Sequence, residues 1–291
     1  MDQRIINLYD NFTHGGMNRR DFLDRLAKLA GSTAAATALL PILQNNYAQA
    51  AIIPENDARL VTERISYDSP KGKINGYLAR PKAKGKRPVV LVIHENRGLN
   101  PHLEDMARRF AAEGFLGYAV DLLSLVGGTP ASEDAARDLH AKLNQDDAVA
   151  ALTSAVTFLK GHPESTGKVG AVGFCFGGLM VNRLAVASPV LDAGVAYYGR
   201  QVAADQVPNI KAALMLHYAE KDDGVNAGIA AYEAALKANN KKYTLHSYPG
   251  TQHAFSNDLG AARYNKAAAD LAWSRTVAFF KEQLGAPPNA A

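Results

Sequence analysis

The feature that constrains this chain most is the hexapeptide Gly-Phe-Cys-Phe-Gly-Gly at residues 173–178, which follows the apolar run Val-Gly-Ala-Val. The apolar run predicts a buried strand, and the glycines predict a tight turn with a helix opening at Gly177. A turn of the pattern G-x-nucleophile-x-G lifts its central side chain clear of a sheet, and glycines flank it because a Cβ would not fit. The central residue is Cys175, the only cysteine of the chain, so the turn indicates a thiol nucleophile.

A structural role for the cysteine is the alternative. A single cysteine is often a small buried hydrophobic residue, and glycine-rich strand-to-helix turns also occur in nucleotide-binding folds. The nucleotide hypothesis is weak, because the chain has no G-x-G-x-x-G pattern and no Gly-Lys-Ser/Thr after the turn. A catalytic role therefore requires an acid and a histidine further along the chain.

Both follow, in the order nucleophile, acid, histidine. A predicted strand at 212–217 leads into an acidic turn with Asp222, and a predicted strand at 243–248 leads into a loop with His253. This is the order of α/β-hydrolases, in which each member lies on a loop just past a strand. Active sites of open α/β sheets form at those carboxyl ends, so the three loops are expected to converge there.

Together these motifs resemble the dienelactone hydrolase family (carboxymethylenebutenolidases), cysteine-dependent members of the α/β-hydrolase superfamily. The resemblance covers most of residues 60–284. It implies an α/β fold with a mostly parallel sheet covered by helices on both faces, and a catalytic triad of Cys175, Asp222 and His253. It rests on the cysteine turn, the Asp222 turn, and the segments His-Glu-Asn-Arg-Gly at 94–98, Gly-Thr-Gln-His-Ala-Phe at 250–255 and Arg-Thr-Val-Ala-Phe-Phe at 275–280.

The acid and the histidine both have rivals. Asp222 is preferred to Asp223 because it matches the acid-x-x-Val spacing of the family. His253 is preferred because it alone lies in a loop marked by glycine and proline at the expected place. The other histidines considered end apolar strands or lie within a strand, where structural or outward-facing roles are expected: His94, His217 and His246.

The residue types define the expected chemistry. A thiolate would attack an ester or lactone carbonyl. Because the thiol of a free cysteine has a pKa of about 8.5 and is mostly protonated at neutral pH, His253 would serve as the base toward Cys175. Asp222 would orient the imidazole and stabilise the imidazolium. The backbone N–H groups of Phe176 and Asn96 are expected to hold the oxyanion.

The resemblance gives Glu95 a part in activating the cysteine when substrate binds. The alternative is a carboxylate that braces the loop before a helix beginning near Asn100. The best-known family members hold an anionic lactone with arginines, one of them a few residues after the catalytic histidine. Asn257 stands at that place here, so recognition of a substrate carboxylate is not implied. Substitute cations, each alternatively a solvated surface charge, are Arg97, Arg137 and Arg200.

The N-terminus predicts an export signal. Asn-Arg-Arg-Asp-Phe-Leu at 18–23 is a twin-arginine sequence, followed by a mild apolar run at 34–43 and by Ala-Gln-Ala at 48–50. This pattern is typical of a Tat signal and of a periplasmic or exported protein. The alternative is an amphipathic arm retained on a cytoplasmic protein. The apolar run is too short and too rich in alanine to predict a membrane span.

The expected organisation is a signal segment over 1–50, a linker over 51–59, a catalytic domain over 60–285 and a tail over 286–291. Strands alternate with helices, which is typical of a mostly parallel α/β sheet. Strands are predicted at 60–67 and 73–79, as an antiparallel pair, and at 89–93, 116–120, 169–172, 193–198, 212–217 and 243–248. Helices are predicted at 103–113, 146–160, 179–187 and 227–238.

Composition and motifs limit the kinds of molecule that this protein is expected to bind. The formal charge of +4 is modest and the basic residues are dispersed, which gives a nucleic-acid partner no support. No Cys/His cluster or H-E-x-x-H motif indicates a metal, and no cofactor is expected. The partner that the sequence indicates is a small ester or lactone, and it indicates no oligomeric state. The alternatives are a general carboxylesterase or thioesterase, and a non-hydrolytic relative that binds a ligand or carries a redox-sensitive thiol.

Overall fold

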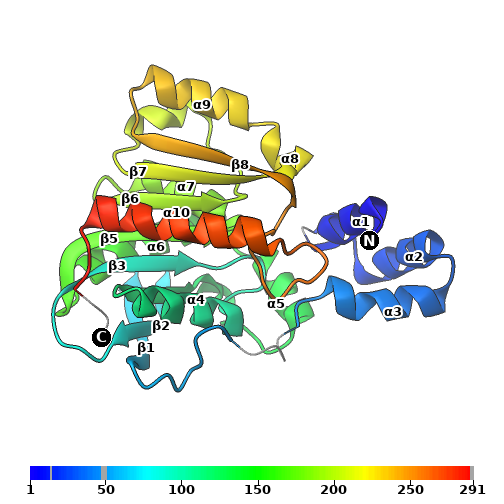
Figure 1. Ribbon diagram of the computed structural model, residues 1–291, viewed down its shortest axis with the longest axis horizontal. Helices are drawn as coiled ribbons and strands as arrows, with labels where there is room; N and C mark the ends of the chain where they lie inside the picture. The colour runs from blue at the N-terminus through cyan, green and yellow to red at the C-terminus, as the bar shows by residue number, and fades with distance from the viewer. Residues whose placement is uncertain (14, 47–50, 289–291) are drawn as a thin grey trace.

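An eight-stranded sheet, in the order β1-β2-β4-β3-β5-β6-β7-β8, runs through the protein (Figure 1). The computed structural model describes residues 1–13, 15–46 and 51–288. The β1–β2 and β2–β4 pairs are antiparallel and the other pairs are parallel, which confirms the predicted fold class. The strands are β1 (Leu60–Ser69), β2 (Gly72–Pro81), β3 (Arg87–Ile93), β4 (Leu116–Asp121), β5 (Ser165–Phe174), β6 (Ala193–Tyr197), β7 (Ala213–Lys221) and β8 (Tyr243–Gln252).

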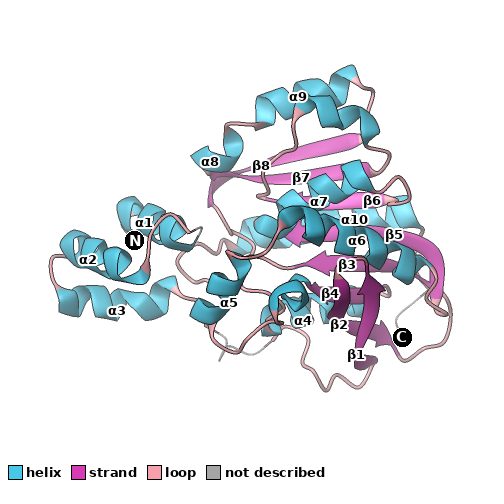
Figure 2. Cartoon of the chain, turned by 180° about the vertical axis from the view of Figure 1, so that it is seen from behind, coloured by secondary structure: helices cyan, strands magenta, loops and turns pink. Residues whose placement is uncertain are grey.

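Helices cover both faces of this sheet. Residues of α4 and α10 pack on one face, and residues of α6, α7 and α9 pack on the other (Figures 1 and 2). The α-helices that follow β3 in the chain are α4 (Pro101–Ala112), α5 (Glu133–His140), α6 (Gln145–Lys160), α7 (Phe176–Ala187), α8 (Asp223–Asn226), α9 (Ile229–Ala238) and α10 (Lys266–Leu284).

Strand β3 shows why its sequence is apolar throughout. Val90 and Val92 pack toward α4 and α10, whereas Leu91 and Ile93 pack toward α6 and α7. All four side chains are fully buried. Because successive side chains of a strand point to opposite faces, a sheet covered on both faces requires apolar residues at every position.

The strand order places the functional loops. From β3 the chain reaches β4 on one side, and β5 then pairs with β3 on its other side. The loops that follow β3 and β5 therefore leave the same edge of the sheet at a point where the strand order reverses. Such switch points open a crevice at the carboxyl ends of the strands, where α/β proteins bind their ligands.

Three further helices precede the sheet: α1 (Gln3–Thr13), α2 (Arg19–Ala30) and α3 (Thr33–Leu43). They form a compact group beside the edge toward which the β3 arrowhead points (Figure 1). Asn18 and Ser32 cap α2 and α3 by accepting hydrogen bonds from backbone N–H groups. The group has an apolar cluster of its own, formed by Ile5, Tyr9, Phe12, Phe22, Leu26, Ala36 and Leu43.

The twin arginines lie at the start of α2. Arg19 forms an ion pair of 2.6 Å with Asp134 of α5. The Ala-Gln-Ala sequence falls within 47–50, outside the described residues, and the Tat signal, its cleavage and export stay predictions. Among the described residues no single helix is long and apolar enough to cross a membrane. Helices α2 and α3 reach that length and apolar composition only when they are taken together, and the pair is bent by 111°.

The rival histidine His217 belongs to a buried polar network. Arg275 donates to the Tyr248 hydroxyl (3.2 Å), which lies 2.8 Å from His217 Nδ1, and His217 Nε2 lies 3.1 Å from Thr276 Oγ1. The same Thr276 hydroxyl is 2.7 Å from the hydroxyl of Tyr197. Burial lowers the pKa of His217 well below its ordinary value, so the imidazole is neutral. His217 therefore ties β7 to β8 and α10.

Replacing Thr276 by valine tests this network. Thr276→Val leaves two buried polar groups without their shared partner, which is expected to lower the free energy of unfolding by about 1–3 kcal/mol. Urea denaturation measures the change. Thr157→Val, on the exposed side of α6, is the matched control and should stay within about 0.5 kcal/mol. Equal effects of the two substitutions would contradict a stabilising role for the network.

Candidate active site

Cys175 occupies a sharp turn between β5 and α7. Its backbone has φ 55° and ψ −112°, a left-handed conformation that costs about 1–3 kcal/mol for a residue with a side chain. Surrounding contacts hold it there: the Cys175 N–H donates to the Tyr197 carbonyl (3.0 Å), and its own carbonyl accepts from Leu179 (3.1 Å). The helix opens at Phe176, one residue earlier than expected.

Two glycines allow this turn to lie against β3. A Cβ on Gly173 would come within 2.1 Å of the Gly177 carbonyl oxygen. A Cβ on Gly177 would come within 2.3 Å of the carbonyl oxygen of Ile93, the last residue of β3. Real Cβ atoms do not approach so closely, so the pattern of glycines follows from the closeness of the turn to the neighbouring strand.

The predicted acid and histidine meet beside this turn. His253 Nδ1 lies 2.6 Å from Asp222 Oδ2, and both side chains are largely buried. Asp223 is exposed in the first turn of α8. Burial lowers the pKa of His253, but the Cys175 charge, hydrogen bonds with Asp222 and Cys175, and the Asp222 charge outweigh it and raise the pKa well above its ordinary value. The imidazole thus contacts both the thiol and the carboxylate.

His94 positions the loop after β3. The Leu122 N–H donates to His94 Nε2 (3.1 Å), so the ring proton is on Nδ1, which donates to the Glu95 carbonyl (2.5 Å). Burial lowers the pKa of His94, which keeps the ring neutral. The role of this histidine is structural, as expected. The third rival, His246, is half-buried in β8 with its ring stacked 5.6 Å from that of His217.

Glu95 points its carboxylate toward the pocket that holds Cys175. Its Oε2 accepts a hydrogen bond of 3.2 Å from the Asn257 side-chain amide. Its Oε1 is buried and has no hydrogen-bond partner among the described residues. The Asn257 amide therefore binds the protein's own carboxylate at the position where the resemblance led us to expect an arginine.

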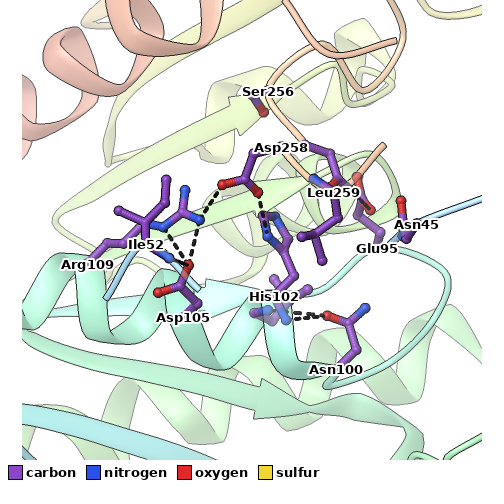
Figure 3. A network of polar contacts seen from close by, with 12 residues as sticks. Asn45, Ile52, Glu95, Asn100, His102, Asp105, Arg109, Ser256, Asp258 and Leu259 are labelled. Carbon is purple, nitrogen blue, oxygen red and sulfur yellow. Dashed lines mark hydrogen bonds and ion pairs between the residues drawn. The ribbon is translucent and has the colours of Figure 1, made fainter. Parts of the chain in front are cut away.

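An ion-pair network anchors the loop that carries His253 and Asn257 (Figure 3). Asp258 pairs with Arg109 (2.6 Å) and with His102 (3.1 Å), both on α4, and Arg109 also pairs with Asp105 (2.6 Å). Burial raises the pKa of Asp258, but the His102 hydrogen bond and the Arg109 charge outweigh it and lower the pKa to about 2. The carboxylate is therefore charged at neutral pH and ties the loop to α4.

The pocket at Cys175 is small, with a volume of about 30 Å³. It includes the expected residues Glu95, Asn96, Arg97, Cys175 and His253. Arg137 and Arg200 do not line it: Arg137 stacks on Phe12 (4.3 Å to the ring centroid), and Arg200 is exposed after β6. Phe176 directly follows Cys175 at the start of α7. The remaining lining residues, which sequence reasoning missed, are Tyr9, Thr13, Asn45, Glu133, Ala254 and Arg263.

These missed residues had no local signal. Tyr9 and Thr13 lie in the segment interpreted as an export signal, and Arg263 lies in a loop without a recognisable motif. A second cavity of about 340 Å³ lies between α4, α10 and the loop after β8, and neither Cys175 nor His253 lines it. Among the described residues, no group of three or more His, Cys, Asp or Glu side chains is placed to hold a metal ion.

Comparison with known proteins identifies the family to which this chain belongs. The sequence model of the dienelactone hydrolase family matches residues 74–284, almost three quarters of the chain. The chain belongs to the dienelactone hydrolase family. A different model, described as YqhI-like, matches residues 1–31. The dienelactone hydrolase match thus covers most of the sheet and its helices, and α1–α3 lie outside it.

Individual relatives agree with this family. Protein usf of Aquifex pyrophilus is 36% identical over 233 residues, which cover 76% of this chain and 99% of the relative. A Methylorubrum extorquens protein, provisionally named a carboxymethylenebutenolidase, is 28% identical over 86% of this chain and 91% of its own. A solved structure from Klebsiella pneumoniae, provisionally named a dienelactone hydrolase, has a TM-score of 0.70 and 28% identity over 77% of this chain and 99% of its own.

The contact between Cys175 and His253 in this dienelactone hydrolase family member can be tested by titration. Cys175→Ala removes a charge and a hydrogen bond that raise the pKa of His253, so the imidazole should titrate at a lower pH in the variant. Nuclear magnetic resonance of the histidine side chains measures this shift, with the remaining histidines as internal references. An unchanged His253 pKa would show that the thiol does not act on the imidazole.

Proposed function

We propose that this protein is a cofactor-free cysteine hydrolase of small esters or lactones, with Cys175 as nucleophile, His253 as base and Asp222 as the orienting acid. The observation that carries the proposal is the position of Cys175 on a strained turn, in the wall of the same pocket as a His253 imidazole that Asp222 holds at 2.6 Å. A nucleophile, a base and a group that orients the base are the components of covalent catalysis.

The proposed reaction has two stages. In the first, His253 takes the thiol proton, Cys175 Sγ attacks the carbonyl carbon, and the C–O bond breaks as the leaving oxygen receives the proton from His253. The product is a thioester on Cys175. In the second, His253 takes a proton from water, the hydroxide attacks the thioester, and the acid product leaves as the thiol is restored. Asp222 accepts a hydrogen bond from the imidazole throughout and favours its charged form.

The oxyanion of each tetrahedral intermediate needs two donors. The N–H of Phe176 lies in the first turn of α7, where backbone N–H groups have no partner within the helix. Asn96 lines the pocket from the loop after β3, which the His94 contacts hold in place. These two positions support the assignment of both backbone N–H groups to the oxyanion.

Glu95 is proposed to assist the activation of Cys175. The support is its buried Oε1, which lacks a hydrogen-bond partner among the described residues, and its place in the pocket wall with Cys175 and His253. Asn257 fixes the other oxygen. A carboxylate held in this way offers the thiol proton an alternative acceptor to His253.

Substitution of the nucleophile tests the proposal directly. Cys175→Ala should lower the hydrolysis of p-nitrophenyl acetate and of small lactones by about 10³-fold or more, because the proposed covalent intermediate forms on the thiol. Acid quenching of the wild type during turnover should trap one acetyl group per chain, detected by mass spectrometry. Circular dichroism controls for folding.

A variant as active as the wild type would refute the assignment of Cys175. A folded wild type that hydrolyses no ester, thioester or lactone of the panel would favour the non-hydrolytic alternatives, in which the protein binds a ligand or carries a redox-sensitive thiol.

The two neighbouring aspartates provide a matched pair. Asp222→Asn should lower kcat by about 10²–10⁴-fold with little change in KM, because the amide no longer stabilises the imidazolium. Asp223→Asn makes the same chemical change at an exposed position and should leave kcat within about twofold. Steady-state kinetics on p-nitrophenyl acetate measures both. The reverse result would transfer the role of the acid to Asp223.

A further inference from the structure

Helix α1 narrows the proposed catalytic pocket. Tyr9 and Thr13 of α1 form part of its wall, and the remaining volume of about 30 Å³ has room for about two water molecules. Pockets that bind small molecules typically measure about 300–1,000 Å³. Cys175 is partly exposed, but the space beside its thiol is too small to hold an ester while α1 lies in this position.

Polar contacts from α1 reach the loops that carry the site. Asp10 forms a partly buried ion pair with Arg263, which belongs to the loop after β8 and places its guanidinium 5.2 Å from the ring centroid of Tyr9. The carbonyl of Thr13 accepts a hydrogen bond from the side chain of Asn96, on the loop after β3. The end of α1 thus contacts a residue proposed to hold the oxyanion.

A second set of contacts lies at the rim. Arg19 pairs with Asp134 at 2.6 Å, and Gln3 donates to the Gln252 side chain at 3.0 Å, next to His253. Contacts of this kind between exposed groups contribute about 0–1 kcal/mol each. The rim contacts orient the helices without fixing them permanently.

The apolar contacts have a different distribution. The apolar cluster of α1–α3 is separate from the two clusters that pack on the sheet, and Ala262 is the one residue from beyond position 50 among the described side chains packed against it. Movement of the three helices as one body would therefore break polar contacts and expose little apolar core. Interfaces within a chain that are small and polar permit such movement.

We propose that helices α1–α3 (3–13, 19–30 and 33–43) form a lid over the catalytic pocket that moves away as one body to admit substrate, and that the Asp10–Arg263 pair holds the lid closed. This proposal rests on the proposed function in one respect: the pocket at Cys175 is taken to be the one that receives substrate. Breaking the pair from the Asp10 side leaves the Arg263 guanidinium without its ion-pair partner on α1 in the closed state, which favours opening. Cleavage at the predicted export site would remove the lid altogether.

Cys175 is the only cysteine, so its labelling rate reports access to this pocket alone. Methyl and benzyl methanethiosulfonate are neutral reagents with the same chemistry: the thiolate attacks the sulfenyl sulfur, a mixed disulfide forms and methanesulfinate leaves. Each rate is measured on the full chain and divided by the rate with free cysteine. The benzyl-to-methyl ratio then reports steric access, because a change in thiol reactivity affects both reagents equally.

We expect the wild-type ratio to be at least about tenfold below that of free cysteine. Asp10→Ala should raise the ratio by up to about tenfold, which corresponds to about 1.4 kcal/mol in the opening equilibrium. Asp24→Ala is the matched control: it removes the same charge from an exposed position on α2 and should leave the ratio unchanged. The double variant Gln3→Ala/Arg19→Ala removes both rim contacts and should also raise the ratio. This variant provides the test if Asp10→Ala does not fold.

A wild-type ratio equal to that of free cysteine would overturn the proposal, because the pocket would then be open. An unchanged ratio in both Asp10→Ala and the rim variant would overturn it as well. The labelling reaction requires only a thiol, so its outcome does not depend on hydrolysis. If Cys175→Ala keeps esterase activity while the labelling ratios behave as expected, the proposed function fails and the lid stands.

Discussion

The candidate active site of this protein depends on one close approach, that of the turn at Cys175 to the end of β3. The Cys175 N–H bonds to β6 and the Cys175 carbonyl bonds to α7, and these contacts hold the left-handed backbone of the turn. The turn folds tightly against α7 because Gly173 has no Cβ, and it approaches β3 closely because Gly177 has none. The same approach brings the loop after β3, with Glu95 and Asn96, next to the thiol. A parallel sheet with a switch point at this place makes that meeting possible.

Charged side chains position the part of the site that the sheet does not hold. The loop after β8 lies outside the sheet, and its position depends on the ion pairs of Asp258 with α4. That anchoring fixes Asn257 against Glu95, while His253 is fixed separately by Asp222. Because buried ion pairs are stable only with several partners in place, the network specifies the loop geometry more than it adds to the free energy of unfolding.

The N-terminal helices reduce the space beside Cys175. They leave only about 30 Å³ beside Cys175, and their own apolar cluster is separate from those on the sheet. In the proposed arrangement, the helices limit the access of oxidants to this partly exposed thiol until they move. In the proposed mechanism, access to the nucleophile and the chemistry of the nucleophile are therefore controlled by different parts of the chain.

The sequence by itself predicted the eight strands, the antiparallel pair at the start, the family, and the order of Cys175, Asp222 and His253, because these depend on local apolar runs, glycines and spacing along the chain. It did not predict that Asn257 binds Glu95, that Arg263 and Tyr9 line the pocket, or that Arg137 and Arg200 lie outside its lining. Those outcomes join residues up to about 250 positions apart. Only the tertiary structure decides them, because the partner of an arginine, a tyrosine or an amide is whichever group the packed elements bring within hydrogen-bond distance.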